Sequence, residues 1–160
     1  MKNIQRHRYK DKKIFETRTL TFDAYPYSEI DQVIRLIQDN LTSDLLKGRK
    51  SLMYPSDVLT NKYYGHCYHS SQALHYLMDC DILIPMSGED YRGEKHWWLQ
   101  DGQKIYDCTA KQYLDKGKLP PYNTGKKSVW YGWKQRPQQV SLKLMKRVLK
   151  DRLVSDTITK

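Results

Sequence analysis

Long apolar runs, cysteine and phenylalanine are all scarce in this sequence of 160 residues. No run approaches the roughly 18 apolar residues that a membrane-spanning helix needs. An integral membrane protein is therefore excluded, and we expect no membrane partner. Two Phe stand beside 13 Tyr and 4 Trp, which indicates a core rich in aromatic rings. The length fits one domain.

Only three cysteines are present, Cys67, Cys80 and Cys108. A sparse and odd count argues against a disulfide framework, so at least one thiol should be free. The first residues, Met-Lys-Asn-Ile-Gln-Arg-His-Arg, lack the apolar stretch of an ordinary secretory signal. We therefore expect a cytoplasmic protein.

Recognised metal-binding motifs are also missing. Zinc is the rival chemistry because His66, Cys67, His69, His75 and Cys80 are close in sequence. However, neither Cys-x-x-Cys nor His-Glu-x-x-His spacing occurs. The first three of these residues would point in different directions from the start of one helix. We expect no metal and no cofactor.

The net charge of +10 lies at the two ends of the chain. Residues 1–13 carry six Lys/Arg against one Asp, and residues 125–152 carry nine Lys/Arg against one Asp. The middle, residues 14–124, has a net charge of −3. Basic ends attract nucleic acid or an acidic partner, or they serve only as a solvated surface.

Hydrophobic spacing predicts helices and strands in one α+β domain. Three helices are expected, which begin near Ser28, near Cys67 and near Pro137. Ser28 and Asp31 approximate a capping box. Strands are expected over residues 14–22, 82–86, 96–100 and 103–107, with loops over 47–60, 89–95 and 115–128.

Asp101 and Gly102 lie between two β-prone runs, which is a strong hairpin signal. If these two residues form the loop, His96 lies directly opposite Asp107. Directly opposed side chains share a face, with Cβ atoms about 4.5–5.5 Å apart. The sequence thus predicts an imidazole beside a carboxylate that orients it. The alternative is a plain cross-strand polar pair.

Cys67 stands where the second helix is expected to begin. A thiol is a weak nucleophile until it ionises, and the first turn of a helix favours the thiolate. Gly65 allows a tight turn just before it. Taken alone, Cys67 fits a buried structural cysteine better than a nucleophile. With His96 and Asp107, however, it completes the thiol, base and orienting group that nucleophilic catalysis needs.

Residues 65–68 (Gly-His-Cys-Tyr), 96–99 (His-Trp-Trp-Leu) and 105–110 (Ile-Tyr-Asp-Cys-Thr-Ala) resemble the papain-like superfamily, above all its transglutaminase and arylamine acetyltransferase type. They also resemble a small family encoded by phages and plasmids, with a Gly-x-Cys-Tyr helix start, a His-Trp strand and an Asp-x-Thr-Ala-x-Gln segment. Arg136-Pro137 matches a basic Arg-Pro of that family.

The resemblance covers about residues 60–150. It implies a papain-like or transglutaminase-like α+β fold, in which an antiparallel sheet packs against the helix that starts at the catalytic cysteine. It also implies a triad of Cys67, His96 and Asp107. A phage origin would place the protein in the host cytoplasm.

The donor to a substrate oxyanion is open. Papain-like proteases carry a Gln shortly before the Cys, whereas residues 61–64 here are Asn-Lys-Tyr-Tyr. Asn61, Tyr64 or backbone N–H groups near Gly65 are the candidates. Trp98 shares the predicted face of His96 and either lines a cleft or packs in the core. Arg136 is a candidate substrate-binding residue.

We therefore expect a cysteine hydrolase or acyl transferase that acts on an amide, isopeptide or thioester bond, most naturally in a protein or peptide. The alternative is a non-catalytic basic module that binds nucleic acid or nucleotides, with the aromatic and basic residues of 122–136 stacking bases and binding phosphates. The predicted organisation is a basic flexible arm over 1–13, a single catalytic domain over 14–153 and a tail over 154–160.

Overall fold

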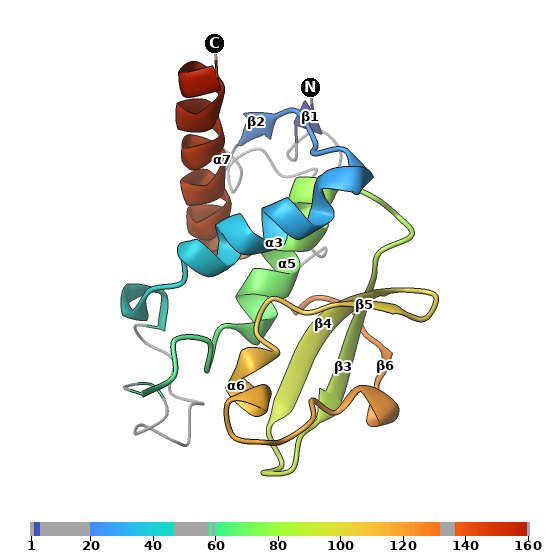
Figure 1. Cartoon of the computed structure of the whole chain (residues 1–160). Helices are drawn as coiled ribbons and strands as arrows, with labels where there is room; N and C mark the ends of the chain where they lie inside the picture. The colour runs from blue at the N-terminus through green and yellow to red at the C-terminus, as the bar shows by residue number, and fades with distance from the viewer. Residues whose placement is uncertain (1, 4–19, 47–57, 59, 132–136, 160) are drawn as a thin grey trace.

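The computed structural model describes residues 2–3, 20–46, 58, 60–131 and 137–159. These residues form an α+β protein in which helices pack against one antiparallel sheet (Figure 1). The predicted mixture of helices with an antiparallel sheet is therefore confirmed.

The sheet has four antiparallel strands in the order β5–β4–β3–β6. The strands are β3 (Ile84–Glu89), β4 (Lys95–Asp101), β5 (Lys104–Tyr106) and β6 (Lys126–Lys127). Burial along β4 is continuous from His96 to Leu99, so both faces of this strand are covered. A separate pair joins β1 (Lys2–Asn3) to β2 (Thr21–Phe22).

The main helices are α3 (Ile30–Asp39), α5 (Cys67–Met78), α6 (Lys111–Leu114) and α7 (Gln139–Thr159). Short 3-10 turns are η1 (Tyr27–Glu29), η2 (Ser43–Leu46) and η3 (Tyr122–Thr124). Helix α5 packs against β4 and also contacts α3 and α7. Its first residue, Cys67, therefore starts the helix that lies on the sheet.

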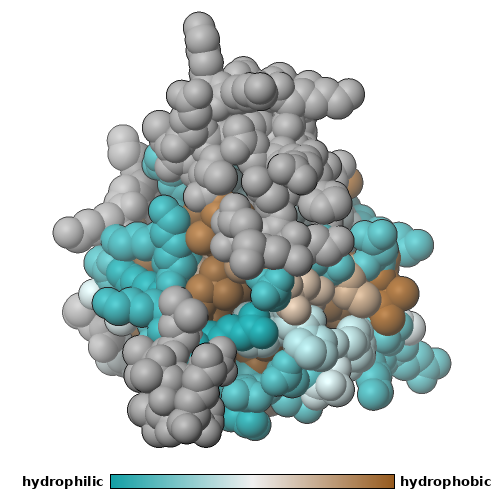
Figure 2. Space-filling model, turned by 90° about the horizontal axis from the view of Figure 1, so that it is seen from above, coloured by the Kyte–Doolittle hydropathy of each residue, from teal (hydrophilic) through white to brown (hydrophobic). Residues whose placement is uncertain are grey.

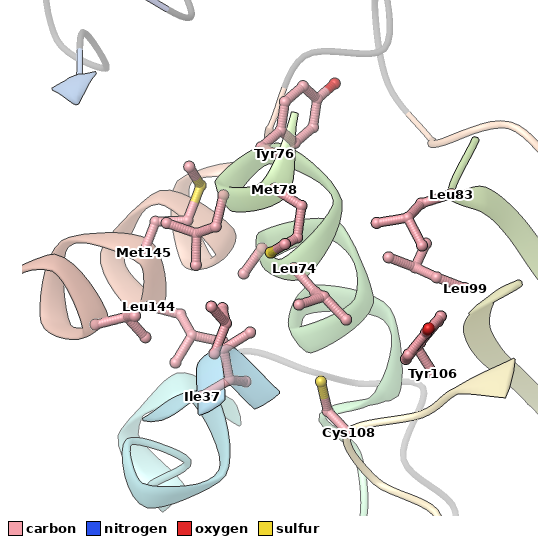
Figure 3. Packing of buried hydrophobic residues seen from close by; sticks show 14 of the residues in the cluster. Ile37, Leu74, Tyr76, Met78, Leu83, Leu99, Tyr106, Cys108, Leu144 and Met145 are labelled. Atoms are coloured by element: carbon pink, nitrogen blue, oxygen red, sulfur yellow. The ribbon is translucent and has the colours of Figure 1, made fainter. Parts of the chain in front are cut away.

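The core lies where α3, α5, α7 and the inner strands meet (Figure 3). Leu74 and Leu77 of α5 are fully buried, as are Leu144 and Met145 of α7. Leu74 and Leu77 are three residues apart and therefore lie on the same side of α5. This packing holds α5 in place and so fixes where its N-terminus opens.

Several predicted boundaries are wrong in ways that have physical causes. Ser28 does not start a helix with a capping box, because the chain enters α3 through η1 and the helix has no side-chain cap. The strand expected at 82–86 begins only at Ile84, since Ile82 is 53% exposed in a turn. Helix α7 begins two residues after Pro137 and continues to Thr159, into the predicted tail.

The loop expected at 89–95 is a tight turn between β3 and β4. Asp90 holds it, because its Oδ1 accepts the backbone N–H groups of Arg92 and Glu94, each at 2.9 Å. Of the strand expected at 14–22, the described part is β2, and residues 14–19 lie outside the described residues.

The face seen in Figure 2 presents mostly hydrophilic side chains over the described residues, with smaller hydrophobic areas between them. Within the described ranges, no helix combines the length and the apolar character needed to cross a bilayer.

Two glycines make room for the indole of Trp98. A Cβ on Gly125 would lie 2.7 Å from Trp98 Cη2, and one on Gly88 would lie 2.8 Å from the Pro121 carbonyl oxygen. Because Trp98 is fully buried, its ring cannot retreat into solvent. The absence of these two side chains therefore lets the segment after Pro121 close over the ring.

We expect Gly125→Ala to lower the free energy of unfolding by about 1–3 kcal/mol, the usual cost of overpacking a core. The φ of Gly125 is −67°, so the backbone tolerates Ala and the cost comes from the clash. Urea unfolding measures it, and the loss should shrink in a Trp98→Leu background. An equal loss in both backgrounds would show that the indole is not the cause.

Candidate active site

The β4–β5 hairpin brings the predicted base and acid together in a register that differs from the prediction. Asp101 pairs with Lys104 and Leu99 pairs with Tyr106, so the turn residues are Gly102 and Gln103, and the predicted Asp101-Gly102 loop is wrong. Gly102 has a φ of +59°, which suits a turn with glycine at its first central position. The shift keeps the faces, so His96 and Asp107 become diagonal neighbours instead of direct partners.

His96 and Asp107 form a short, buried contact. His96 Nε2 lies 2.6 Å from Asp107 Oδ2, and their side chains are 0% and 3% exposed. Aromatic rings enclose the imidazole, with Trp98 stacked at 5.8 Å and the edge of Tyr113 at 4.8 Å between centroids. The ring orientation is therefore fixed by packing as well as by the carboxylate.

The carboxylate of Asp107 is itself held from both sides. Its Oδ1 accepts the Thr109 backbone N–H at 2.9 Å, and its Oδ2 also accepts the Tyr122 hydroxyl at 2.8 Å. Burial, together with the charge and hydrogen bond of Asp107, raises the pKa of Tyr122. Tyr122 thus stays a neutral donor to Asp107.

Cys67 lies at the start of α5, within hydrogen-bonding reach of the His96 imidazole. Gly65 has a φ of +87°, a conformation that favours glycine, and it lets the chain turn into the helix. The sulfur is half-buried, and it donates to the Lys95 carbonyl oxygen at 3.8 Å. It therefore reaches β4 at the residue just before His96.

The protonation of His96 depends on both neighbours. Burial disfavours the charged ring and alone would lower the pKa of His96. The charge and hydrogen bond of Asp107 outweigh it, with further contributions from Cys67, and the pKa rises from 6.5 to about 10. The ring is therefore protonated at neutral pH. Because Nε2 bonds Asp107, Nδ1 is the nitrogen left for Cys67.

A cavity of about 480 Å³ opens beside Cys67. Its walls are largely aromatic, with Tyr64, Tyr68, Trp97, Tyr113 and Tyr131 among the lining residues. At its rim, Lys95 Nζ donates to the Tyr131 hydroxyl at 3.1 Å. The sulfur thus faces a hollow in which a substrate group can lie, while His96 stays behind it, out of solvent.

Of the other predicted site residues, some line the cavity and some do not. Tyr64 and Gly65 line the same cavity as Cys67, although the Tyr64 hydroxyl donates to Glu94 at 2.9 Å. Asn61 is not among the lining residues, and its side-chain oxygen accepts the Tyr63 N–H at 3.0 Å. Arg136 lies outside the described residues.

Of the two alternatives for Trp98, a cleft wall or core packing, the structure shows core packing. Trp98 shares the face of His96, but it is fully buried behind the ring and does not line the cavity. Trp97, on the other face, is the one that lines it. Trp97 stacks on Trp130 at 5.4 Å and is 3% exposed.

Several residues that contact the triad have no site role in the sequence prediction, Tyr122 and Gln112 among them. The sequence marks Tyr122 only as part of an aromatic and basic segment, and Gln112 only as part of the Asp-x-Thr-Ala-x-Gln pattern. The spacing of Asp107, Thr109 and Gln112 could have indicated Gln112, because this short segment runs from the predicted acid directly into α6. The contact of Tyr122 had no such local signal.

The structure also shows where Cys80 and Cys108 lie and whether a cluster of metal ligands forms. Cys108 is buried in the core (Figure 3), and burial raises the pKa of its thiol. Cys80 is half-buried like Cys67. Among the described residues, no group of three His, Cys, Asp or Glu side chains is arranged to hold a metal ion.

The aromatic and basic segment over residues 122–136 is only partly described. Trp130 is 4% exposed and packs against Tyr68 and Trp97, so it belongs to the core. Lys126 and Lys127 form the exposed edge strand β6. Trp133, Lys134 and Arg136, the rest of the predicted binding surface, lie outside the described residues.

Comparison of the chain with family models, with curated proteins and with solved structures gives no significant match.

Proposed function

We propose that this protein is a cysteine hydrolase or acyl transferase, with Cys67 as nucleophile, His96 as acid and base, and Asp107 as the group that orients His96. The observation that carries the proposal is the buried 2.6 Å contact between His96 and Asp107 beside a sulfur that faces a cavity. A half-exposed surface pair would need no such enclosure by aromatic rings.

The electrostatics support this assignment. A protonated imidazole next to a helix N-terminus favours a thiolate, which is the reactive form of cysteine. His96 has its Nε2 occupied by Asp107, and so presents Nδ1 to the thiol. The two groups thus resemble the ion pair that activates a nucleophilic cysteine.

The proposed reaction has two halves. The Cys67 sulfur attacks the carbonyl carbon of an amide, isopeptide or thioester, and the electrons of the C=O bond move to its oxygen. As the intermediate collapses, His96 gives its proton to the leaving nitrogen or sulfur, and a thioester remains on Cys67. Water or an acceptor amine then attacks this thioester, neutral His96 takes the proton, and the thiolate is released.

The order of the parts also supports a papain-like or transglutaminase-like fold. The cysteine opens a helix that lies on an antiparallel sheet, the histidine follows on β4, and the aspartate comes directly after β5. The open, aromatic-walled cavity favours a protein or peptide substrate, because aromatic walls give a large contact area for side chains.

Alkylation with a limiting amount of iodoacetamide at pH 7 tests the proposal. We expect Cys67 to react faster than Cys80, which has similar burial, when the sites are quantified by peptide mass spectrometry. His96→Ala should slow Cys67 by about 10- to 30-fold, since an unassisted thiol is only a few per cent thiolate at pH 7.

His69→Ala is the matched control. His69 belongs to the same helix and lines the same cavity, but its Nδ1 contacts Ser141 at 3.2 Å. The His69→Ala variant should leave the alkylation rate of Cys67 close to that of the unmodified protein. Equal reactivity of Cys67 and Cys80, or an unchanged rate in His96→Ala, would reject the proposed function.

A further inference from the structure

Gln112 lies inside the proposed site without having been given a role in it. The residue belongs to α6, is 5% exposed and lines the cavity together with Cys67. A glutamine buried this deeply needs partners for its amide, because unpaired buried polar groups are costly. The partners that it has are members of the triad network.

The amide of Gln112 is held through Asp107. Gln112 Nε2 donates to Thr109 Oγ1 at 3.1 Å, and the Thr109 backbone N–H donates to Asp107 Oδ1 at 2.9 Å. Asp107 thus uses Oδ2 to orient His96 and Oδ1 to anchor the residue that fixes Gln112. One carboxylate thereby positions two side chains around the sulfur.

Only one N–H of the amide is used by Thr109. The same nitrogen lies 3.5 Å from His96 Nδ1, the ring nitrogen that remains for Cys67. A separation of 3.5 Å is long for a hydrogen bond, so the ring holds this N–H only weakly. The second N–H of Gln112 can therefore turn to a group that enters the cavity.

We propose that Gln112 is the side-chain donor to the oxyanion that forms when Cys67 attacks a carbonyl group. This inference rests on the proposed function and adds a catalytic residue to it. As the bond between sulfur and carbon forms, negative charge moves onto the carbonyl oxygen. A preorganised N–H at that oxygen stabilises the transition state more than the substrate.

The two side chains expected to donate from sequence are placed unfavourably for this role. The Tyr64 hydroxyl donates to Glu94, and Asn61 is not among the residues that line the cavity. Gln112 approaches from α6, beyond the triad in sequence. The backbone N–H of Cys67, in the first turn of α5 and so without a partner within the helix, is the natural second donor.

Two reagents separate oxyanion stabilisation from nucleophile activation. 4-Nitrophenyl acetate acylates the sulfur through an oxyanion and releases nitrophenolate, whereas iodoacetamide transfers its carbon by displacing iodide and builds no oxyanion. We expect Gln112→Ala to slow acylation of Cys67 by about 10²-fold and to leave its alkylation rate unchanged. Gln112→Met, which keeps the size and the neutral charge but loses the N–H donors, should behave in the same way.

Gln100→Ala is the control, because Gln100 lies outside the cavity lining and its amide donates to the Gly102 carbonyl oxygen at 2.8 Å. It should change neither rate. If both rates fall in the Gln112 variants, the residue only positions the triad, and if neither falls, it has no role; each result overturns the inference while the proposed function stands. Failure of the unmodified protein to acquire an acetyl group on Cys67 would instead remove the proposed function itself.

Discussion

Cys67→Ala is expected to abolish turnover of 4-nitrophenyl acetate, a loss of about 10⁴- to 10⁶-fold in kcat, as is typical when a covalent nucleophile is removed. Ala has no atom that can carry the acyl group. The fold should be retained, because the sulfur is half-buried at a helix start and its contact to the Lys95 carbonyl oxygen is long, at 3.8 Å. We expect the free energy of unfolding to change by less than about 1 kcal/mol.

Two further cysteine variants separate catalysis from packing. Cys80→Ala removes a thiol of similar burial outside the site and should retain full turnover. Cys108→Ala removes a sulfur from the core, so it should lower stability without acting on the chemical step. Steady nitrophenolate release by a folded Cys67→Ala variant would mean that another group performs the reaction.

The strongest local patterns predicted the elements that place the site. The start of α5 at Cys67 was readable because Gly65 marks a turn and the apolar stripe that follows has helical spacing. The shared face of His96 and Asp107 was also readable, since it depends only on the parity of the strands. The register itself was not, because Gly102 suits either central position of a two-residue turn and the choice depends on the whole sheet.

The features that the sequence could not predict depend on contacts between distant segments. Parity correctly put Trp98 on the face of His96, but it could not tell that the segment after Pro121 would cover that face. The missing side chains of Gly88 and Gly125 make this closure possible, and they carry no pattern in the sequence. The same closure brings Tyr122 to Asp107, which is why no local motif indicated it.

The charge on His96 makes the stability of the protein depend on pH. Because the pKa of His96 is raised from 6.5 to about 10, the folded state holds the proton more tightly than the unfolded chain. The resulting stabilisation is fully present below about pH 6.5 and is lost as the pH rises toward 10. The free energy of unfolding should therefore fall across this window, by an amount on the order of a few kcal/mol.

Asp107→Asn is expected to remove most of this dependence. A neutral amide does not stabilise the imidazolium, and burial then lowers the pKa of His96. We expect urea unfolding at pH 6 to show a large loss of stability in the variant, and at pH 9.5 a much smaller one. Turnover should also fall, by about 10³- to 10⁴-fold, because the ring loses the partner that sets its tautomer.

Asp107→Asn in a His96→Gln background isolates the interaction between His96 and Asp107. The other histidines are common to all the variants, so their contribution cancels when the variants are compared. Without the imidazole, Asp107→Asn should cost the same at pH 6 and pH 9.5, and its residual effect reflects the lost contacts to Thr109 and Tyr122. A pH-dependent cost that persists in that background would show that His96 is not the group that Asp107 holds protonated.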